Sequence, residues 1–268
     1  MKGVESGLLD FSRLEMLAAG DSPVHRLDPR TKVLVTAAFL VFVVLHGKYD
    51  LAGLAPLALY PVAAMALSGL PAGYILGKLL LASPFVLLVG VWNPVLDRGI
   101  LVTVGGLPIS GGWISFASIV VRFALTLSAA LILIATTGFD QVCRGLSRLY
   151  APKAFVLQLL LLYRYIFVLA GEAARMVRAF RLRNLSDERP AMRTYAALLG
   201  SLLVRALDRA QRIHMAMLSR GFDGEIRMSR PMRLRLADAA WAAFWIAFFI
   251  LVRRYDIPGL LGQIVIAH

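Results

Sequence analysis

The amino-acid sequence predicts an all-α integral membrane protein with about five transmembrane helices and a cytoplasmic platform of long helices. Of its 268 residues, 59% are hydrophobic and only 17% are charged, and the mean hydropathy is +0.73. Soluble domains are about half apolar and about a quarter charged. The apolar residues also gather in stretches near the length of about 20 residues that crosses a bilayer as a helix.

The expected spans contain no Asp or Glu. They are Lys32–His46, Leu51–Leu70, Tyr74–Leu96, Trp113–Thr137 and Ala239–Val252, of which the first and last are short. A sixth apolar stretch, Ala154–Ala170, contains Gln158 and Arg164. Because a charged side chain is costly in lipid, we expect this helix to be partly covered by protein.

Charge orients these segments. The net charge is +13, and Gly171–Leu236 contains fourteen Arg, no Lys and six acidic residues. The positive-inside rule places this region in the cytoplasm, together with the basic N-terminal 32 residues. Four spans return the chain to the cytoplasm, so Ala154–Ala170 is not expected to cross. The last span then crosses outward and leaves Arg253 and Arg254 outside, against the rule.

The same composition excludes several classes of function. In a membrane protein the positive charge indicates anionic lipid and orientation rather than nucleic acid. The one cysteine, Cys143, allows no intramolecular disulfide, and the four histidines show no metal-chelating spacing. There is no phosphate-binding loop or nucleophile motif. Mixed charges precede the first apolar run, so no cleavable signal peptide is expected. We expect a non-catalytic chain without a metal or cofactor of its own.

The cytoplasmic region reads as two long helices. Thr194–Arg220 carries an apolar stripe at steps of three and four residues: Tyr195, Leu199, Leu202, Ala206, Ala210, Ile213 and Met217. Asp208 and Arg212 are spaced for an i,i+4 pair. The helix should end with Gly221 as its left-handed C′ residue and Phe222 packed on Met217. The preceding helix should end near Asn184, a second residue that tolerates a left-handed backbone.

Each of these helices ends in an arginine, Arg183 or Arg220. The simplest explanation is that a cation near a helix C-terminus is favoured by about 0.3–1 kcal/mol. The alternative is that the planar guanidinium binds carboxylates or carbonyls in a groove of a soluble partner. Two further positions carry similar alternatives. Arg122 in the fourth span is either functional or bonded to backbone. "LDPRTK" at Leu27–Lys32 is either a helix start capped by Asp28, with Pro29 at N1, or a partner contact.

Four segments together resemble the CbiQ family, the cobalt-transporter branch of the transmembrane coupling subunits of energy-coupling factor transporters. They are "DSPVHRLDPRTKVL" (Asp21–Leu34), "PKAFVLQLLLLYRYIFVL" (Pro152–Leu169), "MVRAFRLRN" (Met176–Asn184) and "AMLSRGFDGEIR" (Ala216–Arg227). Each motif is weak alone, and the order and spacing make the resemblance specific. It runs from about Asp21 to Arg235.

The resemblance implies three regions along the chain. Residues 1–137 would form the N-terminal segment and four spans, 138–236 the cytoplasmic coupling-helix region, and 237–268 the last span and tail. Two X-Arg-X triplets at coupling-helix ends would insert into grooves of the ATPase subunits. The matching triplets are Leu182-Arg183-Asn184 and Ser219-Arg220-Gly221. The first departs from the commoner Ala-Arg-Gly form, and Arg181 is a rival for its arginine.

The resemblance also implies the partners and the place in the cell. They are an ABC-type ATPase dimer (CbiO-like), which would bind the ATP, a substrate-binding membrane subunit (CbiM-like) that would hold the metal, and a small CbiN-like subunit. The chain would be a multi-pass protein of the cell (inner) membrane with its N-terminus and coupling region cytoplasmic. Nickel or a vitamin is an alternative cargo. A lipid-modifying enzyme or a non-transport membrane scaffold is an alternative class.

Overall fold

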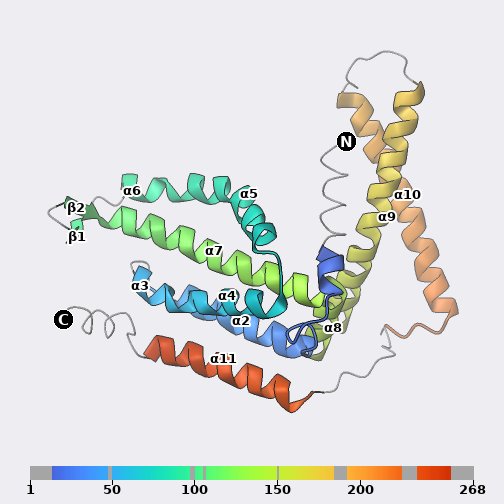
Figure 1. The fold of residues 1–268 in the computed structure, drawn as a ribbon. Helices are drawn as coiled ribbons and strands as arrows, with labels where there is room; N and C mark the ends of the chain where they lie inside the picture. The colour runs from blue at the N-terminus through green and yellow to red at the C-terminus, as the bar shows by residue number, and fades with distance from the viewer. Residues whose placement is uncertain are drawn as a thin grey trace. The chain divides into compact units, whose positions relative to one another are not determined.

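The computed structural model describes residues 14–47, 50–96, 100–104, 107–149, 151–183, 192–224 and 234–254. These residues are mostly helical, as Figure 1 shows, and five helical segments among them are long and apolar enough to cross a membrane. The predicted all-α membrane fold is therefore confirmed. The five segments are Leu51–Ser68, Ala72–Pro94, Gly111–Thr137, Lys153–Arg183 and Leu236–Arg254.

The chain divides into two compact units. One comprises residues 14–145 and 232–268, and the other comprises residues 1–13 and 146–231. We call the described residues of the first unit the bundle and those of the second the helix pair. The division falls inside α8 (Phe139–Arg148), between Gly145 and Leu146.

The bundle contains helices at all five expected spans, with altered boundaries. The first of them, at 17 residues, is not among the five segments above, which instead include Lys153–Arg183, the segment with the stretch Ala154–Ala170 that was not expected to cross. The elements of the bundle are α2 (Pro29–Leu45), α3 (Leu51–Leu54), η1 (Pro56–Ala58), α4 (Leu59–Ser68), α5 (Ala72–Gly90), α6 (Trp92–Leu96), α7 (Gly111–Thr137) and α11 (Leu236–Arg254). The second expected span is broken into α3, η1 and α4, because Pro56 has no N–H to donate to a continuous helix. The third is interrupted at Val91, between α5 and α6.

A short β-hairpin lies before α7, between the third and fourth expected spans. β1 (Ile100–Val104) pairs antiparallel with β2 (Leu107–Ser110). The β-branched residues of "ILVTV" favour extended backbone over helix, which explains these strands. The hairpin leads directly into α7.

The helices α2 and α11 are parallel neighbours. At their first turns the backbone N–H of Asp28 donates to Oδ1 of Asp238 over 2.9 Å. At their last turns a guanidinium N–H of Arg253 donates to the carbonyl of Leu45 over 2.9 Å. Figure 1 shows the two helices running in the same direction. The predicted cap of α2 is confirmed, since Oδ1 of Asp28 accepts from the N–H of Arg30 and Pro29 stands in the first turn.

Aromatic side chains fill the centre of the bundle. The ring of Phe39 lies 4.8 Å from that of Tyr60 and 5.5 Å from that of Phe249, and Tyr60 meets Trp245 edge-on at 5.0 Å. The hydroxyl groups of Tyr60 and Thr36 are 2.9 Å apart and share a hydrogen bond. Each ring pair adds about 0.5–1.5 kcal/mol beyond area burial. These contacts hold α2, α4 and α11 together.

Candidate functional site

The helix pair consists of α9 (Lys153–Arg183) and α10 (Met192–Ser219). The predicted amphipathic helix is confirmed as α10. The apolar stretch Ala154–Ala170 and the coupling segment after it form one continuous helix of 31 residues, α9. The α9 helix is uninterrupted because no proline occurs between Lys153 and Arg183.

Ion pairs join the two helices near their middles. The carboxylate of Glu172, on α9, lies 2.9 Å from a guanidinium nitrogen of Arg209 and 3.4 Å from one of Arg205, both on α10. The predicted pair of Asp208 and Arg212 does not form within the described part of the chain. Arg205 and Arg209 on α10 therefore form ion pairs with the neighbouring helix α9 rather than with acidic residues of α10 itself.

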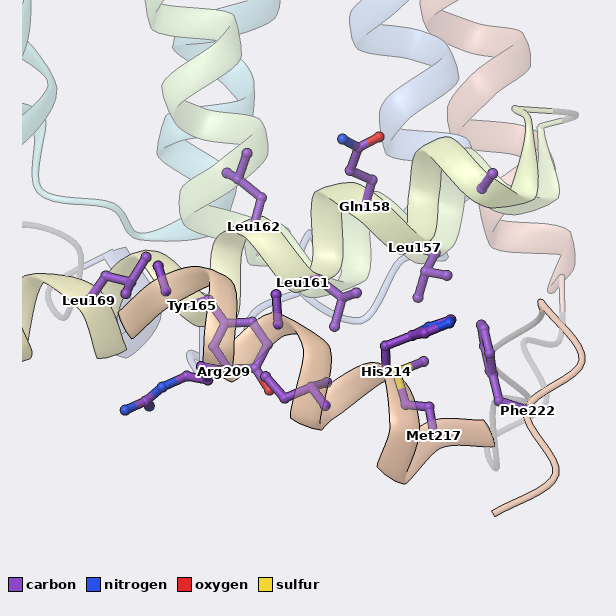
Figure 2. A pocket seen from close by; sticks show the side chains of 14 residues that line it. Leu157, Gln158, Leu161, Leu162, Tyr165, Leu169, Arg209, His214, Met217 and Phe222 are labelled. Atoms are coloured by element: carbon purple, nitrogen blue, oxygen red, sulfur yellow. The ribbon is translucent and has the colours of Figure 1, made fainter. Parts of the chain in front are cut away.

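An apolar groove of about 490 Å³ runs between α9 and α10. Figure 2 shows Leu157, Leu161 and Tyr165 on α9 facing Arg209, His214 and Met217 on α10, with Phe222 closing one end. Four members of the predicted stripe line it: Ala206, Ala210, Ile213 and Met217. The C-terminal half of the predicted stripe therefore faces α9, while Tyr195 and Leu199 of its N-terminal half are exposed.

The two helices are antiparallel along their contact. The groove joins the beginning of α9, at Ala154 and Leu157, to the end of α10, at Met217. A second depression joins the end of α9, at Arg183, to the beginning of α10, at Leu198. The two predicted Arg tips, Arg183 and Arg220, therefore lie at opposite ends of the pair.

The end of α10 forms the left-handed cap that the sequence predicted. Gly221 has φ +77°. The N–H of Phe222 donates to the carbonyl of Met217 over 3.1 Å, and the N–H of Gly221 donates to that of Leu218 over 3.0 Å. These two bonds define a Schellman motif, with Arg220 as the last helical-side residue before the turn. Ser219 and Arg220 are exposed, and the hydroxyl of Ser219 donates to the carbonyl of Met215.

The end of α9 presents the second triplet. Leu182 is 78% exposed, unusually high for a leucine, and Arg183 is exposed beside it. Arg181, the rival, is exposed too. Asn184 lies outside the described residues, so its expected left-handed cap stays a prediction. Within the described ranges no acidic side chain pairs with Arg183 or Arg220.

Two polar side chains of the bundle, Arg122 and Asp238, bind backbone groups of other segments. Arg122, which the sequence left open, donates from α7 to the carbonyls of His46, over 2.8 Å, and Gly47 at the end of α2. This contact is the backbone bond that the sequence offered as one alternative. Asp238, which sequence reasoning missed, is 2% exposed and binds the N–H groups of Asp28 and Arg235. Its signal was an acidic residue in the first turn of an apolar helix.

The part of the chain that the structure describes brings together no group of three or more His, Cys, Asp or Glu side chains able to hold a metal. The sole cysteine, Cys143, is buried on α8, and burial raises the pKa of its thiol to about 11. A neutral, buried thiol is a poor nucleophile and a poor metal ligand. The exposed Arg tips therefore stay the predicted site in this part of the chain.

Comparison with known proteins agrees with the order of motifs. Residues 20–231 match the model of the CbiQ family, described as cobalt transport protein. An energy-coupling factor transporter transmembrane protein EcfT of Thermosediminibacter oceani is 28% identical over 239 residues, which cover 84% of this chain and 89% of the relative. The EcfT of Lactococcus lactis subsp. cremoris is 29% identical and covers 76% of this chain and 82% of its own length.

The name of a third relative specifies a metal. The cobalt transport protein CbiQ of Rhodobacter capsulatus is 36% identical over 118 residues, 43% of this chain and 48% of the relative. The family match extends over the bundle from α2 to α8 and over both helices of the pair, and so includes both Arg tips. With five helical segments able to cross a bilayer, the chain is a multi-pass membrane protein that belongs to the CbiQ family of cobalt transport proteins.

Proposed function

We propose that this chain is the non-catalytic transmembrane coupling subunit of an ATP-driven energy-coupling factor importer, and that its transporter carries Co²⁺. The relatives named as EcfT cover most of this chain and support the membrane-component role. The family description and the relative from R. capsulatus support cobalt. Ni²⁺ is the alternative cargo, because nothing in this chain's own chemistry distinguishes the two ions.

The observation that carries the proposal is the placement of Arg183 and Arg220. Both side chains are exposed at helix ends, and neither has an acidic partner among the described residues. Leu198 lies beside Arg183, and α10 rises about 1.5 Å per residue, so the tips are about 33 Å apart along its axis. Two tips this far apart suit two separate grooves, one in each subunit of an ATPase dimer.

The parallel packing of α2 and α11 supports a cytoplasmic helix pair. Two parallel helices cross a membrane in the same direction, so an odd number of crossings must separate them. The segment α3–α4, the segment α5–α6 and α7 supply three. A crossing by α9 alone would make four, which is incompatible with the parallel pair. α9 is long and apolar enough to cross, so parity alone argues against it, whereas α10, 28 residues long, is not apolar enough to supply a second crossing that would restore parity. Neither α9 nor α10 is therefore proposed to span the bilayer.

The outer face of α10 supports a second, apolar partner. Among its exposed large apolar side chains, five lie together on one face: Leu203, Val204, Leu207, Met215 and Leu218. The sequence stripe did not include them, because they lie beside it on the helix rather than within it. An apolar face of this size is costly in water. We propose that the substrate-binding membrane subunit covers it.

The proposed mechanism is mechanical. ATP binding closes the ATPase dimer, and the two docked Arg tips move with its halves. The ion pairs of Glu172 and the apolar side chains that line the groove join α9 to α10, so the two helices move together as one rigid unit. Their movement changes the surface offered to the substrate subunit and so opens or occludes its binding site. The chain itself binds neither ATP nor metal in this scheme.

The proposal is tested by purifying the tagged chain from native membranes in mild detergent and identifying what accompanies it by mass spectrometry. An ABC-type ATPase together with a second multi-pass membrane protein is the expected result. Metal analysis of that complex after incubation with Co²⁺ or Ni²⁺ then distinguishes the cargo. Recovery of the chain without an ATPase, under conditions in which another ABC transporter of the same membranes stays intact, would refute the coupling role.

A further inference from the structure

The first turn of α2 contacts two bundle residues that flank the inserted unit in the sequence, Gly145 and Asp238. The chain leaves the bundle after Gly145 and returns to it at residue 232. Near the exit, Gly145 of α8 packs on the backbone of Pro29. Near the return, Asp238 of α11 binds the backbone of Asp28. The residues Asp28, Pro29 and Arg30 thus contact Gly145, the last bundle residue before the inserted unit, and Asp238, which follows that unit in the bundle.

The contact at Gly145 is tight even for a methyl group. A Cβ placed there would lie 3.2 Å from both the carbonyl carbon and the carbonyl oxygen of Pro29, and 3.4 Å from the nitrogen of Arg30. Such distances are tighter than ordinary van der Waals contact, and backbone cannot rotate away as a flexible side chain can. Gly145 therefore allows α8 to approach α2 at backbone distance.

The contact at Asp238 joins two helix N-termini. Its Oδ1 accepts from the N–H of Asp28, the N-cap of α2, and its Oδ2 accepts from the N–H of Arg235 just before α11, over 2.7 Å. The side chain is 2% exposed. This buried carboxylate fixes the start of α2 relative to the start of α11, because losing its bond to Asp28 would leave a buried N–H without a partner.

A third contact binds the end of α7 to the same turn. The ammonium group of Lys32 donates to the carbonyl of Thr136 over 3.0 Å, and Lys32 is 5% exposed. Because α7 leads directly into α8, this bond fixes the helix on which the exit connection starts. All three contacts lie within the bundle and depend on four residues of one helical turn.

We infer that the first turn of α2 is the anchor through which movement of the helix pair reaches the membrane bundle, with Gly145 and Asp238 as its positioning residues. The inference rests on the proposed coupling function and goes beyond it by naming the transmission point. It also gives "LDPRTK" a purpose other than partner contact. Loosening either attachment leaves the ATPase docked on its Arg tips but lets the helix pair move without displacing α2.

The test uses the complete complex of this chain with its ATPase and substrate subunit in proteoliposomes, with ATP hydrolysis and Co²⁺ uptake measured on the same preparation. The anchor variants are Gly145→Ala and Asp238→Asn. Asn keeps the size of Asp but presents an amide donor to one of the two N–H groups. Each variant is expected to retain the ATPase and to lower the Co²⁺ transported per ATP at least fivefold.

Two matched controls separate an anchor from a simple loss of stability. Gly90→Ala introduces the same methyl group between α5 and α7, against the ring of Phe116 at 2.7 Å. Asp50→Asn weakens the cap of α3, where Oδ1 of Asp50 accepts from the N–H of Gly53. Both are expected to keep transport per ATP within twofold of wild type, at a melting temperature as low as that of the anchor variants.

The outcomes distinguish the two proposals. Unchanged transport per ATP in the anchor variants, or an equal fall in controls of equal stability, would overturn the anchor alone. A wild-type chain that retains no ATPase would overturn the coupling function and the anchor with it. If Asp238→Asn does not accumulate, Gly145→Ala decides, because its Cβ requires a displacement of only a few tenths of an ångström.

Discussion

The N–H of Asp28 and the carboxylate of Asp238 form a hydrogen bond of 2.9 Å across 210 residues of sequence. This one bond places the first turns of α2 and α11 side by side. It therefore makes the two helices parallel and decides how many crossings can lie between them. The bond also closes the bundle around the point from which the helix pair departs.

Removing this carboxylate should destabilise the bundle. Asp238→Ala leaves the buried N–H of Asp28 without a partner, which costs about 1–3 kcal/mol, and also removes the part-buried bond to the N–H of Arg235. We expect a melting temperature several degrees below wild type in detergent, measured by thermal aggregation. Asp21→Ala is the control. Arg26 lowers the pKa of Asp21 through a side-chain hydrogen bond and its charge, but the pair is fully exposed. An equal loss in both variants would contradict a special role for the buried bond.

Charge reversal at the Arg tips should uncouple the transporter without unfolding it. Arg183→Glu and Arg220→Glu are each expected to lower Co²⁺ uptake by tenfold or more and to weaken retention of the ATPase, because a guanidinium fork is replaced by a repelling carboxylate. Arg178→Glu is the matched control, since Arg178 is exposed on α9 but five residues before its end. Normal uptake by the double tip variant would remove the tips from the mechanism.

Two glycines of the α10 region should respond to alanine in opposite ways. Gly221 has φ +77°, where a Cβ costs roughly 1–2 kcal/mol. Gly200 lies inside α10 with open space around it, so alanine there should stabilise the helix by about 0.5–1 kcal/mol. Hydrogen exchange of the amides of Gly221 and Phe222 measures this directly. Faster exchange is expected in Gly221→Ala and slower exchange in Gly200→Ala, and the same direction in both would be inconsistent with the Schellman cap.

The ion pair between Glu172 and Arg209 should contribute modestly to the rigidity of the helix pair. Glu172 is 12% exposed and Arg209 36%. A double-mutant cycle with Glu172→Gln and Arg209→Gln is expected to give a coupling energy of about 0.5–1 kcal/mol, measured from the thermal stability of the purified chain. Adding 0.5 M NaCl should reduce it, because salt screens partly exposed pairs. A coupling energy indistinguishable from zero would show that the apolar contacts along the groove, rather than this ion pair, hold α9 to α10.

Cys143 should be unreactive in the folded protein. Burial first, and the charge of Asp140 second, raise the pKa of its thiol to about 11. The folded state therefore holds this proton more tightly than the unfolded state, so stability should fall as the pH rises from about 9 towards 11. Maleimide labelling at pH 7.5 should be at least tenfold slower than after unfolding in SDS. A Ser219→Cys variant, exposed at the end of α10, is the fast-reacting control.

The sequence predicted the local features well because they depend on neighbours in the chain. The cap of α2 by Asp28, the amphipathic α10 and the left-handed Gly221 follow from spacing and residue type. The break of the second span and the β-hairpin before α7 were missed. The overall hydropathy of a stretch does not reveal where a proline or a run of β-branched residues ends a helix.

The sequence did not predict which residues of other helices the charged side chains bind. The expected pair of Asp208 and Arg212 followed from helical spacing, yet the arginines of α10 that form ion pairs do so with Glu172 on α9. Arg253 seemed to conflict with the charge rule, and the structure shows it bonded to the carbonyl of Leu45 at the end of α2. In both cases the charged side chain binds a group on another helix. Residue spacing along a single helix cannot identify such a partner.

By itself the sequence determined the class of the protein, its family motifs and the positions of its two Arg tips, because hydropathy, charge and capping are properties of short segments. Only the tertiary structure decided that α2 and α11 are parallel, that the Arg tips lie at opposite ends of an antiparallel helix pair, and that Gly145 and Asp238 meet on one turn of α2. These relationships depend on which helices pack together. That choice is made by the summed contacts of buried side chains far apart in the chain, and no single segment contains it.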